Sequence, residues 1–444
     1  MVSGSDLISS VTQERPAFVG TPSRLSTDRY TSSDFALAEA RNLWGHVWQM
    51  ACREEEVEDV GDFVEYIIAD QSYVVIRSSS GTIKAYPNAC LHRGTQLKQG
   101  RGTATEFRCS FHAWCWELDG TCREILDPGD FGDPDLADLR LPECAVATWA
   151  GFVFINPDPD GIPFEEWIAP VAERTDAYRM EDMRYVSLRS TIVPANWKVG
   201  VEAFIESYHI FGTHPQAVLA SDGTYAMFDG FGEHGRMIVP MGRPTARIEI
   251  EDESEILDEM VPNLIGLAKL PKAQVDRLRR IADGIEDLEG RPLRDVLIEM
   301  GKERAIALNY DDSRFSESQY WDQHEWHVFP NLVLGIIPGE VFGFRFRPWG
   351  LDPDASVFEV LSLRFPDESY EKAQPVEIPY SRDPDERRQT WGPILHQDFS
   401  NLEKVQRGLH STSLQKTRIS GYQEQLIARY HKVIDQYLTR YQDA

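Results

Sequence analysis

The sequence lacks long apolar runs and has few basic residues for its length. No stretch approaches the roughly 18 consecutive apolar residues that a membrane-spanning helix needs. The N-terminus, Met-Val-Ser-Gly-Ser-Asp, does not show the basic and then apolar order of a signal peptide. We therefore expect a cytoplasmic protein that does not enter the membrane. Lys and Arg number 45 against 72 Asp and Glu, a formal charge of -27, which argues against nucleic-acid binding because phosphates are contacted mainly by Lys and Arg.

Cysteine is also scarce, but it is unevenly distributed. Only six cysteines occur in 444 residues, and five of them fall between Cys90 and Cys144. In a chain with no secretory context, such a cluster indicates metal ligation before disulfides. We expect ordinary buried thiols at the four cysteines that lack a ligand-spaced partner, which are Cys52, Cys115, Cys122 and Cys144.

Length and local patterning predict an α+β chain of two domains. A length of 444 residues exceeds the about 250 to 300 that one hydrophobic core supports. Short alternating runs from about 54 to 126, and strand character again at 145–155, predict a small antiparallel β domain. The pattern of the remaining C-terminal part of the chain predicts a mixed α/β domain, with a central antiparallel sheet covered by helices. The expected segments are a helical or extended 1–43, the β domain 44–157 and the larger domain 158–444.

The larger domain alternates between helical and strand patterns. Helical periodicity is expected at 165–180, 197–211, 268–305 and, with breaks near Gly408 and Gly421, at 402–441. Strands are expected at 185–193, 327–337, 340–347 and 356–365.

The first constellation of possible ligands combines two short motifs. Cys90 and His92 form one pair, and Cys109 and His112 form the other after sixteen intervening residues. Two thiolates and two imidazoles suit either zinc or a cluster in which Cys holds one iron and His the other. Zinc sites usually pair Cys with Cys and His with His along the chain, whereas each loop here offers one of each. This alternation favours the two-iron cluster.

The second constellation lies in the segment that begins at Asn196. It contains Glu206, His209 and His214. Two imidazoles and a distant carboxylate make the facial triad of non-haem iron oxygenases, although two satisfied core histidines are the plainer alternative. Glu206 stands three residues before His209, so on a helix both would share a face and could be hydrogen bonded. We expect Gly212 to open the helix and let both rings converge.

The motifs that begin at Cys90 and Cys109, Cys-x-His-Arg-Gly and Cys-x-x-His-x-Trp, resemble the Rieske domain of ring-hydroxylating non-haem iron oxygenases. The resemblance implies a 2Fe-2S cluster held by Cys90, His92, Cys109 and His112. The family commonly has Pro-Tyr where this chain has Ser110 and Phe111, and Gly where it has Ala113. Loss of a Tyr hydroxyl near a cluster sulfur implies a shifted potential.

The second constellation resembles the mononuclear iron motif of the same family. The resemblance implies His209, His214 and Asp398 as ligands of a mononuclear Fe(II), because the family's Asp precedes a Gln-x-Gly by about eight residues, as Asp398 does. It also implies that Glu206, where most members have Asp, bridges to a cluster His of a neighbouring subunit. Ala203 replaces an Asn that is common in the family.

The other candidates near these motifs are weaker. Asn196 and Tyr208 are further candidate catalytic residues within the second motif, and Glu403 is the local rival to Asp398 as a ligand. We expect His396 and His410 to lie at the surface or next to the metal ligands, and not to bind the metal themselves.

By resemblance, the chain is the catalytic alpha subunit of an oxygenase that uses O2. Electrons from NAD(P)H would reach it through a reductase, sometimes with a ferredoxin. A head-to-tail homotrimer, with or without a β subunit, would bring each cluster to a neighbour's iron.

Family analogy also predicts an apolar, aromatic substrate that is hydroxylated or demethylated in aromatic compound catabolism. Phe204, Phe211 and the stretch from Trp326 to Leu334 are predicted pocket walls. The rival functions are a Rieske electron carrier without oxygenase activity and a zinc-stabilised binding protein.

Overall fold

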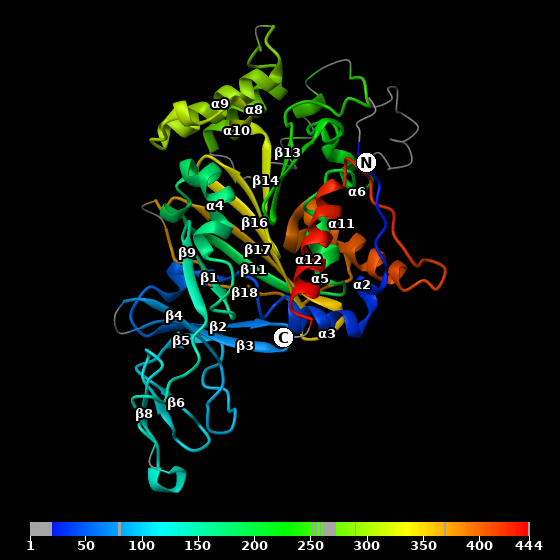
Figure 1. The fold of residues 1–444 in the computed structure, drawn as a ribbon. Helices are drawn as coiled ribbons and strands as arrows, with labels where there is room; N and C mark the ends of the chain where they lie inside the picture. The colour runs from blue at the N-terminus through cyan, green and yellow to red at the C-terminus, as the bar shows by residue number, and fades with distance from the viewer. Residues whose placement is uncertain are drawn as a thin grey trace. The chain divides into compact units, whose positions relative to one another are not determined.

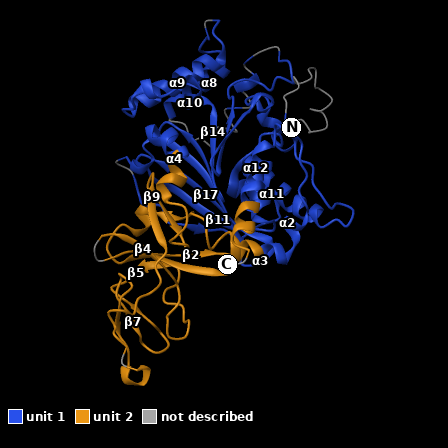
Figure 2. Ribbon diagram, viewed as in Figure 1, with its two compact units in different colours: residues 1–36, 170–434 blue, residues 37–169, 435–444 orange. Residues whose placement is uncertain are grey.

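The computed structural model describes residues 20–442, apart from 79–80, 133, 251–252, 254, 258–259, 261–271, 289 and 368–369. The chain divides into two compact units, one taking in Met1–Ala36 and Pro170–Ile434, the other Leu37–Ala169 and Asp435–Ala444 (Figure 2). Each unit thus joins segments that are distant in the sequence. The division into 1–43, 44–157 and 158–444 stays a prediction, and residues 1–19 of its first segment lie outside the described residues.

The smaller unit is built on antiparallel sheets of short strands (Figure 1). The strand orders are β1-β10-β9, β4-β3-β2-β5 and β6-β7-β8. Their bounds are β1 Gln49–Arg53, β2 Asp62–Ile68, β3 Gln71–Arg77, β4 Ile83–Pro87, β5 Arg101–Thr103, β6 Phe107–Arg108, β7 Cys115–Trp116, β8 Cys122–Glu124, β9 Ala145–Trp149 and β10 Phe152–Asn156. The predicted small antiparallel β domain is confirmed.

One core of this unit contains cysteines of both ligand motifs. Cys90 and Cys109 are buried in the same apolar cluster as Phe107 and Trp116. The other four cysteines, Cys52, Cys115, Cys122 and Cys144, are also buried free thiols, as predicted.

The larger unit is organised around one eight-stranded sheet in the order β12-β13-β14-β15-β16-β17-β11-β18. All its pairings are antiparallel except that of β18 with β11. The bounds are β11 Arg184–Val193, β12 Met227–Phe231, β13 His234–Val239, β14 Gln323–Val328, β15 Leu332–Ile337, β16 Glu340–Trp349, β17 Asp352–Arg364 and β18 Val376–Glu377. The predicted α+β class, with a central antiparallel sheet in the second half, is confirmed.

The helices are α2 Asp28–Thr31, α3 Ser33–Asn42, α4 Phe164–Thr175, α5 Trp197–Ala203, α6 Ile210–Thr213, α8 Lys272–Ala282, α9 Leu293–Ala307, α10 Glu317–Trp321, α11 Pro384–Leu409 and α12 Gln425–Arg440. Of these, α2, α5, α10 and α11 contact strands of this sheet. Short 3-10 turns lie at Glu54–Val57, Pro128–Phe131, Asp176–Tyr178, Met180–Asp182, Pro215–Ala217, Gly223–Tyr225 and Asp312–Arg314. Helix α5 contacts β16 and β17, and α11 contacts α5 and α6, so the segments that carry the second constellation lie together in the larger unit.

The predicted helix at 197–211 is wrong in its second half. Asn196 caps α5 by accepting a hydrogen bond from the Lys198 N–H, but the helix ends at Ala203 and the chain turns until α6 begins at Ile210. Gly212 lies inside α6, so the opening occurs before the first histidine and not at that glycine.

Other predicted elements were joined or misplaced. The predicted strand 327–337 is two strands, β14 and β15, with the cis Phe329-Pro330 bond between them. The predicted helix 268–305 is α8 and α9, with 268–271 outside the described residues. The helix expected at 165–180 ends at Thr175, shortly before Arg179 adopts a left-handed conformation with φ 54. The strand at 185–193 and the break near Gly421 are confirmed.

No helix within the described ranges is long and apolar enough to cross a membrane.

Candidate metal centres and the adjoining cavity

The first constellation lies on two loops of similar construction in the smaller unit. In one loop the Gly94 N–H donates to the Cys90 carbonyl, and in the other the Ala113 N–H donates to the Cys109 carbonyl. Gly94 and Ala113 both have positive φ, 77 and 60. Each loop thus makes a tight turn.

The tight turns bring one imidazole from each loop together. The ring centroids of His92 and His112 are 4.4 Å apart, and His92 also stacks on Trp114 at 4.9 Å. The Cys90 and Cys109 side chains are hydrogen bonded to each other. The four predicted cluster ligands are therefore gathered in one place.

The side-chain chemistry fits a bound cluster. The Nδ1 atoms of His92 and His112 are both buried, with no hydrogen-bond partner among the described residues. A buried polar atom without a partner is costly, and in each ring it is a nitrogen that could bind iron. Two thiols and two such nitrogens make the donor set of a Rieske centre.

Two of these groups, Cys109 and His112, are shifted towards the form that binds metal, whereas burial raises the pKa of the Cys90 thiol. Burial by itself raises the pKa of the Cys109 thiol, but the backbone N–H groups of His112 and Phe111 donate to its sulfur and hold the pKa below its ordinary value. Burial and the neighbouring His92 lower the pKa of His112. A thiolate and a neutral imidazole are the forms that bind metal.

The second constellation converges in the larger unit. His209 precedes α6, His214 follows it, and Asp398 lies on α11. His214 Nε2 lies 2.9 Å from Asp398 Oδ1, and His209 Nε2 lies 3.9 Å from the same oxygen. One ligand atom from each residue lies within 4.8 Å of the others, so the three could bind one ion.

Neighbouring side chains hold the two imidazoles by their other nitrogens. His209 Nδ1 lies 2.7 Å from Glu206 Oε1, and His214 Nδ1 lies 2.9 Å from Gln397 Oε1. Gln216 in turn donates to Gln397 Oε1 at 2.7 Å. Such contacts fix the orientation of a ligand ring and leave its Nε2 for the metal.

The electrostatics of this site fit a cation. Burial lowers the pKa of His209, but Glu206 and Asp398 more than offset this effect and raise it to about 9. Asp398 Oδ2 is buried and has no hydrogen-bond partner within the described part of the chain. The carboxylates favour the protonated form of His209, and a divalent ion would replace that proton. Two imidazoles and a carboxylate are ligands that suit Fe(II).

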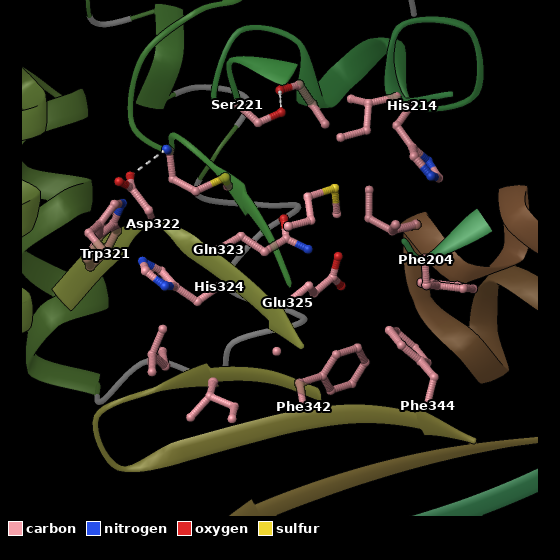
Figure 3. Close-up of a pocket in the computed structure, with 18 of the residues that line it drawn as sticks. Phe204, His214, Ser221, Trp321, Asp322, Gln323, His324, Glu325, Phe342 and Phe344 are labelled. Carbon is pink, nitrogen blue, oxygen red and sulfur yellow. Dashed lines mark hydrogen bonds between the residues drawn. The ribbon is translucent and has the colours of Figure 1, made fainter. Parts of the chain in front are cut away.

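A cavity of about 240 Å³ opens beside the triad (Figure 3). Its described walls come from α5, α6, α8, α10 and α11 and from β13, β14, β15 and β16, and they include aromatic, aliphatic and methionine side chains. Phe204 and Phe344 form one aromatic contact, with ring centroids 4.0 Å apart. His209, His214 and Asp398 line the same cavity, so a molecule bound there would lie next to the metal.

The predicted cavity walls were only partly right. Phe204 lines the cavity, but Phe211 and the stretch from Trp326 to Leu334 are not among its described lining residues. For Trp326 the alternation of β14 is the reason, because Glu325 lines the cavity and the adjacent Trp326 points to the other side of the sheet.

Two residues that the sequence reasoning passed over are Gln397 and Glu325. Burial raises the pKa of Glu325 to about 7, although a hydrogen bond from Gln323 by itself lowers it. The strand of Glu325, Gln323–Val328, is rich in polar residues, so the sequence carried no clear signal for this carboxylate.

The structure places the two further candidate catalytic residues outside the cavity. The Asn196 side chain donates to the Tyr30 and Pro353 carbonyls at 3.2 and 2.8 Å, besides capping α5. The Tyr208 side chain is 58% exposed. Neither is among the described lining residues, and their catalytic roles stay predictions.

The rival ligand and the two downstream histidines lie elsewhere. Glu403 accepts hydrogen bonds from the Tyr380 hydroxyl and the Arg382 guanidinium at 3.0 and 2.9 Å. His410 is exposed beside Asp354, and His396 is half-buried. The group that could hold an ion contains none of the three.

Two family models match this sequence. The model described as "Ring hydroxylating alpha subunit (catalytic domain)" matches residues 175–440, and the model described as "Rieske [2Fe-2S] domain" matches residues 47–133. The first match covers more than half of the chain and includes the whole triad.

Among curated proteins, the chain is similar to the carnitine monooxygenase oxygenase subunit of Escherichia coli (strain K12), with 29% identity over 42% of this chain and 50% of that protein. It is also 29% identical to the anthranilate 1,2-dioxygenase large subunit of Acinetobacter baylyi, over 43% of this chain and 42% of that protein. The chain spans about half the length of the curated relatives it matches.

Among solved structures, the fold is similar to that of a quaternary ammonium Rieske monooxygenase in complex with L-carnitine. The TM-score is 0.63 at 19% identity, over 93% of this chain and 94% of that one. At this identity the likeness shows the fold alone.

Proposed function

This chain belongs to the ring-hydroxylating alpha-subunit family and carries a Rieske [2Fe-2S] domain, and we propose that it is a terminal oxygenase acting on a small organic molecule. It would use O2, with electrons from a reductase or ferredoxin, to hydroxylate or oxidatively demethylate that molecule. The observation that carries the proposal is that His209, His214 and Asp398 lie together at the wall of a largely apolar cavity.

Each group of residues has a distinct task in this proposal. Cys90, His92, Cys109 and His112 would hold the 2Fe-2S cluster, and the triad would hold a mononuclear ferrous ion, which supplies the centre at which O2 is reduced. Glu206 would orient His209 through the 2.7 Å contact to Nδ1. The apolar walls would keep water away from the substrate.

The partners follow from the same family. We propose that electrons originate from NAD(P)H and arrive through a separate reductase, with or without a ferredoxin. We further propose a homotrimer, with or without a β subunit, in which Glu206 connects to a neighbour's cluster histidine. The proposed location is the cytoplasm. An electron carrier without oxygenase activity would have no use for the triad or the cavity, which disfavours that alternative.

Metal analysis tests the proposal. An anaerobic preparation would be assayed for iron, zinc and acid-labile sulfide, and O2 consumption would be followed with a surrogate reductase. The proposal predicts about three irons and two sulfides per chain, with the low average g value of a His-ligated cluster after reduction. Two irons without O2 consumption would indicate the electron carrier, and zinc without sulfide would contradict both.

The two curated relatives described above are named for different substrates, carnitine and anthranilate. Relationship therefore does not decide the substrate class, and the chemistry of the cavity has to be considered by itself.

A further inference from the structure

Glu325 stands in the middle of a row of cavity-facing residues that crosses the sheet. Met237 on β13 pairs with Glu325 on β14, Glu325 pairs with Gly335 on β15, and Gly335 pairs with Phe342 on β16. All four line the cavity. Gly335 has no side chain, so the Glu325 side chain lies over its backbone, with Cγ 3.8 Å from where a Cβ would stand. In Figure 3 the Glu325 carboxylate points into the cavity.

The other carboxylates of the cavity are each paired with a basic group. Those of Glu206 and Asp398 contact the two triad histidines. Two more have an arginine partner, Asp322 with Arg294 at 2.6 Å and Glu340 with Arg364 at 3.0 Å.

Glu325 differs from these four carboxylates. The residues that the structure describes form no ion pair with it, and its hydrogen-bond partner is the neutral amide of Gln323. No lysine or arginine occurs among the described residues that line the cavity. Within the cavity, the basic group that acts on its charge is His209, which would bind a metal as a neutral imidazole.

A metal in the triad would not balance this charge either. The two charges of a ferrous ion would be offset by Asp398 and Glu206, both within the triad and its immediate contacts. Glu325 is only 6% exposed, and a buried carboxylate is costly unless it is paired. A cation in the cavity would supply the missing partner.

The surroundings of Glu325 also suit an organic cation better than a hydrated metal ion. Figure 3 shows the rings of Phe342 and Phe344 beside Glu325, with Phe204 next to them. Aromatic faces attract ammonium groups, whereas a metal ion needs several oxygen ligands.

We propose that the substrate is an organic ammonium ion, held by the Glu325 carboxylate and the neighbouring phenylalanine rings beside the triad. This inference rests on the proposed function, because it names the substrate class of the same site. Glu325 would determine specificity, because it would favour a positively charged substrate over an uncharged molecule of the same shape.

Matched pairs of probes test charge recognition directly. Choline and its uncharged carbon analogue 3,3-dimethylbutan-1-ol form a quaternary pair, and benzylammonium and benzyl alcohol form a primary-amine pair. Binding to the metal-loaded full chain would be measured by calorimetry. We expect at least one cation to bind about 10-fold or more tightly than its neutral partner, which corresponds to about 1.4 kcal/mol. The pair that shows this ratio identifies the type of ammonium.

Substitution then assigns the preference to one residue. Glu325→Gln keeps the shape and removes the charge, so it should abolish the preference and leave the binding of the neutral partner unchanged. Glu173→Gln, at an exposed glutamate on α4, is the control and should keep the preference. Thermal unfolding would verify that both variants are folded. The ratio of cation to neutral-partner affinity in the unsubstituted chain tests charge recognition without either variant.

The outcomes separate this inference from the proposed function. If neither cation binds more tightly than its neutral partner, or if Glu325→Gln keeps the preference, the inference is wrong. Iron and sulfide are measured on the same samples. Filled metal sites without charge preference would overturn this inference alone, whereas absence of the triad iron would overturn the proposed function.

Discussion

His214 Nε2 lies 2.9 Å from Asp398 Oδ1, although 184 residues separate them in the sequence. His209 Nε2 approaches the same carboxylate oxygen at 3.9 Å. The second oxygen of Asp398 is buried without a partner in the described part of the chain, and the three side chains could together hold a metal ion.

Replacing Asp398 should remove the mononuclear iron and spare the cluster. Asp398→Ala eliminates the anionic ligand, so we expect iron affinity at the triad to fall by at least about 100-fold. Iron should drop by about one per chain while acid-labile sulfide stays constant. Glu403→Gln is the matched control and should keep the full iron content. If Glu403→Gln lost iron while Asp398→Ala kept it, the metal ligand would be Glu403 and not Asp398.

Glu206 should be needed for turnover more than for metal binding. It holds His209 Nδ1 at 2.7 Å and accepts hydrogen bonds from the backbone N–H groups of Tyr208 and His209. Glu206→Gln should therefore keep both metals and lower turnover by about 100-fold, the size of effect expected for a small misplacement at a reacting centre. Single-turnover kinetics with a pre-reduced cluster, together with iron analysis, would measure this. Unchanged turnover would contradict the proposed role of Glu206.

Two glycines near the triad should respond oppositely to alanine. A Cβ at Gly200 on α5 would overlap the Phe346 ring of β16, whereas a Cβ at Gly212 on α6 meets nothing within 4 Å among described atoms. Gly200→Ala should destabilise the protein by about 1 to 3 kcal/mol, the usual cost of overpacking. Gly212→Ala should be tolerated, with its iron retained. Denaturant unfolding of both variants would measure the difference, and equal stabilities would contradict the close packing of α5 on the sheet.

The stability of the larger unit should contain an acid-labile contribution from Glu359. Burial alone raises the pKa of this carboxyl, but Arg345 and Arg347 outweigh burial and lower it to about 2. A carboxyl whose folded pKa is depressed stabilises the fold above its unfolded pKa of about 4.5, and this contribution is lost as the pH falls towards 2. The full effect corresponds to about 3 kcal/mol.

Glu359→Gln provides the measurement. The difference in the free energy of unfolding between the protein and this variant should be largest above about pH 5 and shrink by about 2 kcal/mol by pH 3, because acid neutralises Glu359 in the unsubstituted chain. Urea unfolding at each pH would follow it. A difference that does not change between pH 6 and 3 would contradict the depressed pKa.

The sequence by itself identified the residues whose spacing is local. Cys90 with His92, and Cys109 with His112, lie within four residues of each other, so each pair is confined to one tight turn in any fold. The fold class could be predicted for a related reason, since the period of apolar residues distinguishes strands from helices. Asp398 was assigned by resemblance to the family, whose Asp ligand precedes a Gln-x-Gly, because composition alone offers 72 acidic candidates.

Only the tertiary structure decided which side chains face the metal and the cavity. The apolar pattern of 197–211 favours one helix, but the Glu206 carboxylate takes up the N–H groups of Tyr208 and His209, so the chain turns there and His209 meets Asp398. Glu325 and Trp326 are neighbours in the sequence, yet only Glu325 faces the cavity, since successive side chains of a strand point to opposite faces. Which of those faces becomes a cavity wall depends on the helices packed against it, and therefore on contacts that no local pattern specifies.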